Sequence, residues 1–273
     1  MAPTHGTLTH ETRTRETSAT PRPPRTVIVT GAAQGIGAAI AFAAASEGWH
    51  VVGVDLAKDT LAQTMASLPG EHQAVTGDAT DEDVIAQAGE LGAQVGPVTG
   101  FVANAGVIGP GASIEYPIAE WDRLLSVMLT GAFTGARVAA QWMLDTGTGG
   151  SIVMTSSIAG VLGFGARASY CAAKAGVNGL VRSLAIEWAR DGIRVNAVAP
   201  GAIETPLQES MKSTGHSSAA AYRSHIPMDR TGTPNEIADV VTFLLSSKSS
   251  YVTGTVIPVD GGWSAYGMNA GEN

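Results

Sequence analysis

Tyr170 and Lys174 are the residues of this chain best suited to proton chemistry, since they lie four positions apart in a stretch, residues 169–190, that is expected to be helical. That spacing places both side chains on one face of a helix. A tyrosine hydroxyl titrates at about 10 when unperturbed, and a neighbouring ammonium group lowers its pKa by favouring the phenolate. Ser157, at the expected end of a strand, could donate a hydrogen bond to a substrate oxygen. Such a pair is common on helices, so its meaning depends on the rest of the chain.

A glycine-rich turn supplies that context. The β-branched run at residues 26–30 predicts a buried strand, and an alanine-rich helix is expected directly after Gly31, Gly35 and Gly37. A strand, a tight turn and a helix in this order allow the backbone to approach a pyrophosphate, which the N–H groups of the helix N-terminus then bind. The spacing differs from the commoner Gly-x-Gly-x-x-Gly pattern, and a plain turn is the alternative.

Asp55 indicates which dinucleotide is bound. It ends a second expected strand, residues 50–55. A carboxylate there accepts hydrogen bonds from the adenosine ribose hydroxyls and repels a 2′-phosphate. Gln34, Leu56 and Ala57 provide no cation for such a phosphate. The sequence therefore predicts NAD in preference to NADP, although Asp55 could also cap the helix that follows.

Strands and helices alternate along the rest of the chain. Further strands are expected at residues 73–76, 98–102, 151–155, 194–199 and 255–259, and further helices at 59–67, 81–91, 118–143 and 169–190. The helix that opens at Thr233 has a capping-box pattern with proline in its first turn. The fold class is therefore α/β: a single Rossmann-type doubly wound parallel β-sheet with helices on both faces. The expected organisation is a disordered tail over residues 1–25 and one domain over 26–273, with a substrate lid at about 205–230.

Composition narrows the function classes. The chain has 273 residues, a net charge of −8 and a sequence pI near 5.2, which argues against a nucleic-acid or anionic-membrane surface. Its single cysteine, Cys171, allows no internal disulfide. No apolar run is long enough for a membrane span or a signal peptide, so a cytoplasmic location is expected. His216 and His225 lack metal-ligand company, and no metal is expected.

Taken together, the motifs resemble those of the short-chain dehydrogenase/reductase family over about residues 25–263. The residues that carry this resemblance are Thr30-Gly-Ala-Ala-Gln-Gly-Ile-Gly37, Asn104-Ala-Gly106, Ser157, Tyr170, Lys174, Pro200-Gly201 with Thr205, and Val259-Asp-Gly-Gly262. The resemblance implies hydride transfer between a nicotinamide and an alcohol or carbonyl, in a homotetramer with the two long helices at an interface.

The resemblance also implies roles for single residues. Tyr170 is the expected general acid/base, Ser157 polarises the substrate oxygen, and Lys174 binds the nicotinamide ribose and tunes Tyr170. Asp78 could bond the adenine amino group, or it could be an ordinary loop acid. The full expected cofactor set is Gly31, Gln34, Gly35, Ile36, Gly37, Asp55, Asp78, Ala79, Asn104, Ala105, Gly106, Tyr170, Lys174, Pro200, Gly201, Ile203 and Thr205.

Met128 departs from the family pattern. The pattern Trp-Asp-x-x-x-x-Val-Asn-Leu-x-Gly is matched by Trp121-Asp122 and by residues 127–131, with Met128 at the position that resembles the catalytic asparagine. That asparagine is thought to hold a water in a proton relay from the lysine, and methionine cannot hold a water in that way. Three hypotheses follow for the effect of Met128: a working enzyme whose proton relay takes another route, a slow enzyme, or a protein that keeps the fold for binding alone.

The expected reaction is the reversible NAD-dependent oxidation of a secondary alcohol, apolar or cyclic, to a ketone. The alternatives are an NADPH-dependent ketone or 3-oxoacyl-thioester reductase and a non-catalytic NAD-binding scaffold. The substrate pocket is expected to be mostly apolar, with Val107, Ile158, Phe164, Ala202 and Met211 in its lining. Arg167 could hold an acidic substrate, or it could be a surface or interface arginine.

Overall fold

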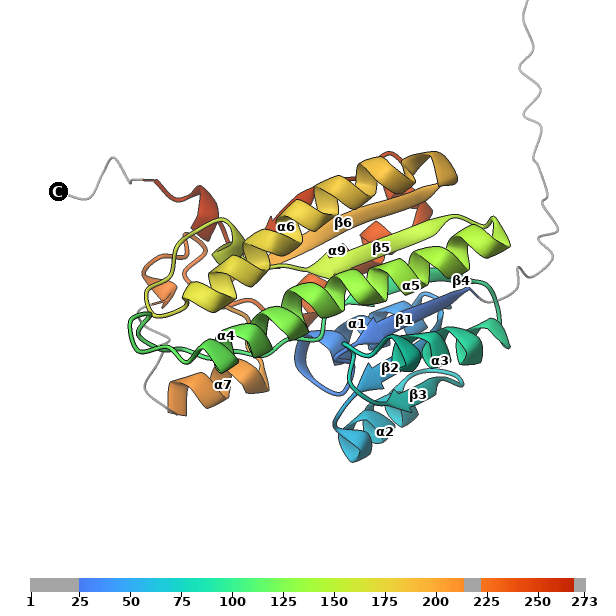
Figure 1. Cartoon of the computed structure of the whole chain (residues 1–273), viewed down its shortest axis with the longest axis horizontal. Coiled ribbons are helices and arrows are strands. Elements are labelled where there is room, and N and C mark those ends of the chain that lie inside the picture. Colours follow the sequence, from blue (N-terminus) through green and yellow to red (C-terminus); the bar gives the residue numbers. More distant parts are fainter. Residues whose placement is uncertain (1–24, 214–221, 268–273) are drawn as a thin grey trace, which may run out of the picture.

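A computed structural model of the chain describes residues 25–213 and 222–267 (Figure 1). The predicted tail, His216 and part of the predicted lid lie outside these ranges. The core is a seven-stranded parallel sheet with the order β3-β2-β1-β4-β5-β6-β7, which confirms the predicted fold class. The strands are β1 (Thr26–Thr30), β2 (His50–Asp55), β3 (Gln73–Thr76), β4 (Val98–Ala103), β5 (Gly150–Thr155), β6 (Ile193–Pro200) and β7 (Val256–Val259).

Helices cover both faces of the sheet (Figure 1). They are α1 (Gly35–Ser46), α2 (Lys58–Ser67), α3 (Glu82–Ala93), α4 (Ile118–Leu125), α5 (Gly131–Thr146), α6 (Ala168–Trp188), α7 (Pro206–Ser213) and α9 (Pro234–Leu245). Side chains alternate between the faces along each strand. Ile28 of β1 packs in the core with α3, α5 and α6, whereas its neighbours Val27 and Val29 pack in the core with α1, α2 and α9.

The predicted helix over residues 118–143 is wrong as a continuous α-helix. α4 and α5 are separated by a π-helical turn, Ser126–Thr130. A π turn adds a residue to the helical repeat, and such insertions occur frequently at functional sites. Here the turn carries Met128, which is 1% exposed and packs with Leu124 and Ala173. The local sequence pattern did not reveal this turn, whose Met128 packs against both α4 and α6.

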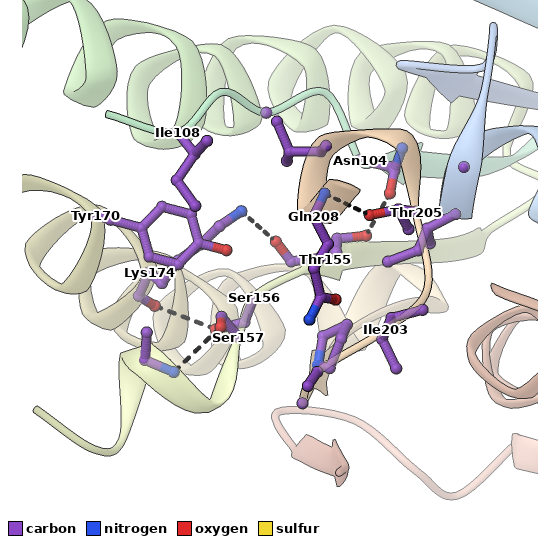
Figure 2. Close-up of a pocket in the computed structure, with 18 of the residues that line it drawn as sticks. Asn104, Ile108, Thr155, Ser156, Ser157, Tyr170, Lys174, Ile203, Thr205 and Gln208 are labelled. Atoms are coloured by element: carbon purple, nitrogen blue, oxygen red, sulfur yellow. Dashed lines mark hydrogen bonds between the residues drawn. The ribbon is translucent and has the colours of Figure 1, made fainter. Parts of the chain in front are cut away.

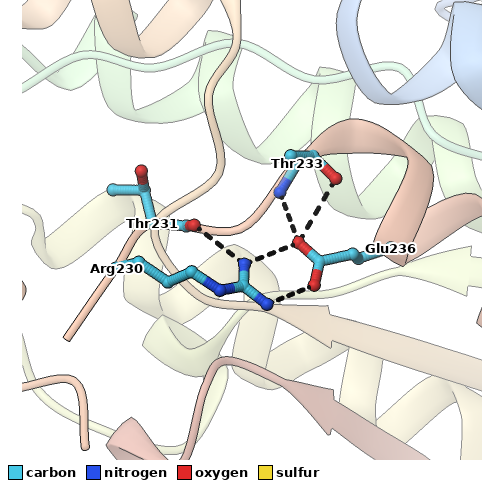
Figure 3. A network of polar contacts seen from close by, with 4 residues as sticks. All are labelled: Arg230, Thr231, Thr233 and Glu236. Carbon is cyan, nitrogen blue, oxygen red and sulfur yellow. Dashed lines mark hydrogen bonds and ion pairs between the residues drawn. The ribbon is translucent and has the colours of Figure 1, made fainter. Parts of the chain in front are cut away.

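An ion-pair network anchors the end of the predicted lid to α9 (Figure 3). Arg230 donates to both carboxylate oxygens of Glu236, at 2.7 and 3.0 Å. The same carboxylate accepts from the backbone N–H of Thr233 at 2.8 Å, so the predicted capping box is present. The Arg230 hydrogen bond, followed by the Thr233 backbone bond, lowers the pKa of Glu236 to about 2. In the described ranges, no helix combines the length and the apolar character needed to cross a bilayer.

Candidate functional site

A cavity of about 350 Å³ opens at the carboxyl ends of the central strands. Its walls come from the segments that follow β1, β2, β4, β5 and β6, together with α6 and α7. The strand order reverses beside β1, since β2 lies on one side and β4 on the other. Ligands of open parallel sheets bind at such a switch point. The topology therefore places the glycine turn and the tyrosine–lysine pair in one cavity.

The glycine turn requires glycine for conformational and steric reasons. Gly31 and Gly35 have positive φ angles of 66° and 58°, a region that side chains disfavour. A Cβ on Gly37 would overlap the carbonyl oxygen of Gly31, so Gly37 allows α1 to pack on the turn. Gln34, the N-cap of α1, makes no side-chain capping bond. The N–H groups of the first helical turn therefore suit an anion.

Asn104 and Thr155 fix the turn from the neighbouring strands. The Asn104 amide nitrogen donates to the carbonyl oxygens of Thr30 and Gly31, at 3.1 and 3.3 Å. The Thr155 hydroxyl donates to the Asn104 side-chain oxygen at 3.2 Å (Figure 2). Asn104 therefore links β1, β4 and β5 beside the cavity, a positioning role that its sequence motif did not specify.

Asp55 faces the cavity from the end of β2. One carboxylate oxygen accepts from the backbone N–H of Ala33 at 3.0 Å, and the other accepts from Ala57, the N-cap of α2, at 3.0 Å. The carboxylate thus contacts both the glycine turn and the start of α2, so the two interpretations of Asp55 are compatible. Lys58, which the sequence interpretation did not weigh, is an exposed residue at the start of α2.

Ser157, Tyr170 and Lys174 converge in the same cavity (Figure 2). The Lys174 ammonium nitrogen donates to the Thr155 carbonyl oxygen at 2.7 Å and lies 5.9 Å from the centre of the Tyr170 ring. Burial lowers the pKa of Lys174 to about 8. Burial also raises the pKa of Tyr170, while the hydrogen bond with Ser157 and the charge of Arg167 lower it by smaller amounts.

The expectation that the lysine lowers the pKa of Tyr170 is therefore wrong for the protein's own groups. Removing the phenolate from water outweighs the charges around it. The four-residue spacing does place both side chains in one cavity, as predicted. Spacing along a helix establishes neighbours, but burial depends on the whole fold.

A polar clamp holds the Ser157 loop on α6. The Ser156 hydroxyl donates to the side-chain oxygen of Asn178 at 2.6 Å, and the Asn178 amide donates to the Gly160 carbonyl at 3.1 Å. A Cβ on Gly160 would come within 2.8 Å of the Lys174 carbonyl oxygen, so the loop must approach the helix closely. The clamp fixes the serine relative to the helix that carries the tyrosine and lysine. Its members were not predicted, because no local pattern relates Ser156 to Asn178.

Aromatic side chains close the other end of the cavity. The Trp263 ring lies 5.6 Å from Phe164 and 5.5 Å from Tyr222, centre to centre, and all three line the cavity. His225 is exposed, and its ring also stacks on Trp263 at 5.7 Å, centre to centre. The Arg167 guanidinium donates to the Tyr222 hydroxyl at 2.9 Å. In the sequence, Trp263 is marked only by its place directly after the glycine pair 261–262.

Most of the predicted site residues line this cavity. Besides the catalytic trio, these are Gly31, Gln34, Gly35, Ile36, Asp55, Asn104, Gly106, Val107, Ile158, Phe164, Pro200, Gly201, Ala202, Ile203 and Thr205. Gly37, Asp78, Ala79 and Ala105 are not in its lining. Asp78 instead accepts a local bond from the N–H of Thr80 at 2.9 Å. Met211 lies in α7, and its side chain is outside the described part of the structure.

The lining also contains residues that the sequence interpretation did not assign to the site. They are Thr155, Ser156 and Trp263. Met128 lines the cavity too, at the position where the family pattern has asparagine. Among the residues that the structure describes, no group of three or more His, Cys, Asp or Glu side chains is placed to hold a metal ion.

Comparisons with known proteins identify the family of the chain. A family model described as enoyl-(acyl carrier protein) reductase matches residues 31–264. Cis-4-hydroxycyclohexanecarboxylate dehydrogenase of Sinomonas cyclohexanicum is 41% identical over 245 residues, 88% of this chain and 97% of that protein. 3-oxoacyl-(acyl-carrier-protein) reductase FabG of Thermotoga maritima is 39% identical over 239 residues, 86% and 96% of the two chains. A crystal structure from Agrobacterium tumefaciens with bound NADP is 34% identical, with a TM-score of 0.78 over 89% and 97% of the two chains.

Proposed function

The chain belongs to the short-chain dehydrogenase/reductase family of oxidoreductases, and we propose that it interconverts a secondary alcohol and a ketone, the alcohol being apolar or cyclic. The observation that carries the proposal is the convergence of Ser157, Tyr170 and Lys174 with the glycine turn in one cavity. The cyclic alcohol in the name of the Sinomonas relative supports the substrate class.

The residues present fit a nicotinamide dinucleotide. The positive φ angles of Gly31 and Gly35 and the uncapped start of α1 suit a pyrophosphate. Asp55 lies at the strand end where adenosine ribose hydroxyls are bound in this topology. When bound, the oxidised nicotinamide supplies a hydride acceptor.

The chain's own groups handle the proton. The positive charges of Lys174 and of a bound oxidised nicotinamide would favour the phenolate form of Tyr170. In the oxidative direction this phenolate would accept the proton of the alcohol hydroxyl while a hydride would pass from the alcohol carbon to the nicotinamide, so that the alcohol becomes a ketone. Ser157 donates a hydrogen bond to the substrate oxygen and orients it. Lys174, held by the Thr155 carbonyl, places its positive charge where phenolate forms. Ser157 and Lys174 are buried, which limits the access of water to the transfer.

We infer NAD rather than NADP as the preferred cofactor, because Asp55 presents a negative charge where the 2′-phosphate of NADP would lie. The NADP-bound relative and the exposed Lys58 favour the opposite choice. Comparing kcat/KM for the two cofactors decides between them. Asp55→Asn is expected to lower the ratio of kcat/KM with NAD to kcat/KM with NADP by at least about tenfold, which corresponds to about 1.4 kcal/mol. The matched control is Asp59→Asn, which neutralises an exposed acid in the first turn of α2. Equal or better use of NADP by the parent protein would overturn the NAD assignment.

Catalysis is tested by NADH formation with a panel of cyclic, aromatic, terpenoid, steroid and polyol secondary alcohols. Tyr170→Phe is expected to reduce kcat by about 10²- to 10⁴-fold and to leave cofactor binding, measured by calorimetry, intact. Tyr251→Phe removes the hydroxyl of an exposed tyrosine and controls for the substitution. If Tyr170→Phe turned over like the parent, the proposed role of Tyr170 would be wrong.

Two alternatives have specific observations behind them. The Thermotoga relative favours a 3-oxoacyl-thioester reductase, but the net charge of −8 opposes docking of an acidic carrier protein. Met128 favours a non-catalytic NAD-binding scaffold, but the intact Ser157, Tyr170 and Lys174 oppose it. Turnover of free alcohols would exclude the non-catalytic scaffold. A 3-oxoacyl thioester on a carrier protein that reacts no faster than the free substrates would exclude the thioester reductase.

We also propose a cytoplasmic homotetramer. Ile118 of α4, Phe133 of α5 and Ile186 of α6 are exposed apolar residues on the helices that the family resemblance places at an interface. Burying such side chains between subunits removes apolar area from water. Light scattering coupled to size-exclusion chromatography measures the assembly, and a monomeric mass at micromolar concentration would refute it.

A further inference from the structure

The side chains of Phe164, Tyr222 and Trp263 form an aromatic wall that is suited to a cyclic substrate. Phe164, Tyr222 and Trp263 come from the loop after β5, the segment before α9 and the turn after β7, and they meet at one end of the cavity. Val107 and Ile108 add aliphatic surface to the lining. Flat and branched apolar groups together fit the faces of a small ring, which gains binding energy from leaving water.

Arg167 brings a positive charge to the same end. It lines the cavity directly before α6, and its guanidinium donates to the Tyr222 hydroxyl at 2.9 Å. Its charge also acts on the Tyr170 hydroxyl, whose pKa it lowers against the larger effect of burial. Arg167 therefore lies close enough to the catalytic tyrosine to affect its pKa, and it contacts the aromatic wall through Tyr222.

Local structure does not favour an arginine at this position. A cation at a helix N-terminus opposes the helix dipole.

The residue before Arg167, Ala166, has a φ of 56°, a left-handed conformation that a residue with a Cβ rarely adopts. Its carbonyl oxygen accepts from the N–H of Gly111 at 3.0 Å, which ties the loop to the segment after β4. Backbone strain of this kind clusters at ligand-binding sites, where the surrounding structure maintains it.

The charges around the cavity are unequally distributed. The charged residues in its described lining are Asp55, Arg167 and Lys174. Asp55 lies at the end of β2 and bonds the glycine turn, which is the nucleotide end. Lys174 lies on α6 beside Thr155, and Arg167 lies directly before α6 beside Tyr222. The described lining contains no carboxylate besides Asp55. A cleft with one sign of charge concentrates ligands of the opposite sign.

We propose that the substrate is a cyclic alcohol that carries a carboxylate, which Arg167 binds while the ring lies against the wall formed by Phe164, Tyr222 and Trp263. This inference deepens the proposed function and rests on it. A guanidinium matches the two oxygens of a carboxylate in a planar, bidentate arrangement, and the Arg167 side chain is part of the cavity wall. The hydroxyl that is oxidised then faces Ser157 and Tyr170 from the opposite side of the ring.

The test compares 4-hydroxycyclohexanecarboxylate with its methyl ester, which keeps the ring and the reacting hydroxyl but lacks the charge. The parent protein is expected to prefer the acid by at least about tenfold in kcat/KM. Arg167→Gln is expected to raise KM for the acid by about 10- to 100-fold and to leave KM for the ester nearly unchanged, while Arg167→Lys is expected to retain part of the preference. Arg182→Gln, an exposed arginine of α6, is the matched control and is expected to behave like the parent.

A binding measurement separates this inference from catalysis. Calorimetric titration of the protein, with NAD present, should show that cyclohexanecarboxylate binds more tightly than its methyl ester, neither of which carries a hydroxyl that can be oxidised. The difference should weaken with salt and vanish in Arg167→Gln. If neutral cyclic alcohols and the ester are oxidised as well as the acid, the carboxylate site is refuted and the proposed function stands. If no alcohol of the panel is oxidised although NAD binds, the proposed function itself is refuted.

Discussion

Replacing Lys174 with methionine would show how strongly burial determines the protonation of this lysine. Lys174 is 4% exposed, and its ammonium group donates to the Thr155 carbonyl oxygen at 2.7 Å. Burial lowers its pKa from 10.5 to about 8. Between these pH values the unfolded chain binds more protons at this site than the folded protein, so native stability rises with pH across the interval.

The size of the effect follows from the pKa values. Since each pKa unit corresponds to about 1.4 kcal/mol, keeping Lys174 charged in the folded protein costs about 3 kcal/mol below pH 8. About 2 kcal/mol of that cost is relieved between pH 7 and pH 9.5. Methionine has a similar length and no charge, so Lys174→Met lacks this dependence. Tyr170 is present in both proteins, and without bound cofactor its raised pKa keeps it protonated over this range.

Urea unfolding at constant ionic strength, without added cofactor, measures the difference. The stability of the parent protein minus that of Lys174→Met is expected to rise by about 2 kcal/mol from pH 7 to pH 9.5. Lys248→Met, which removes an exposed lysine, should show no such trend. Parallel pH profiles for the parent and Lys174→Met would refute the argument, because they would mean that the buried lysine titrates as it does in the unfolded chain.

Three further predictions concern the turn, the sheet edge and the relay. In Gly37→Ala the new methyl group would overlap a carbonyl oxygen of the glycine turn. Calorimetry should therefore show cofactor binding that is weaker by at least about tenfold, or about 1.4 kcal/mol. Gly179→Ala is the control and should not weaken binding, because its Cβ meets nothing within 4 Å. Burial lowers the pKa of His72, whose Nδ1 accepts from the N–H of Val51 at 3.0 Å. The stability of the folded protein should therefore fall as the pH drops below about 6.5. Thermal melts should show a weaker dependence of stability on pH in His72→Asn. Met128→Asn should raise kcat by up to about tenfold and lower stability by about 1–3 kcal/mol, as measured by kinetics and urea unfolding; an unchanged kcat would show that this position does not limit proton transfer.

The elements that hold the cofactor end were predictable because their signals are local. A β-branched run, closely spaced glycines and an alanine-rich stretch specify β1, its turn and α1 within residues 26–46. Asp55 is a fixed position in the same unit, and its bonds to Ala33 and Ala57 are short-range consequences of it. The spacing of Tyr170 and Lys174 likewise follows from the helical repeat alone.

The substrate end was only partly predictable, because its residues are brought together by contacts between distant segments. Phe164 and Trp263 lie far apart in the sequence, and no periodicity relates them, yet their rings are 5.6 Å apart. The π turn that contains Met128 interrupts a helix pattern that would otherwise continue. Ser156 and Asn178 carry no signal of their hydrogen bond until the loop is placed on α6.

The sequence by itself determined the doubly wound sheet, the glycine turn and the identities of the groups that could move a proton, since these depend on the order of residue types along the chain. The tertiary structure decided which way those groups titrate. Burial raises the pKa of Tyr170 and lowers that of Lys174, opposite to what their spacing predicted for the tyrosine. The physical reason is that the charge interactions of such a pair follow from proximity on one helix, whereas the desolvation that outweighs them depends on every segment that excludes water from the cavity.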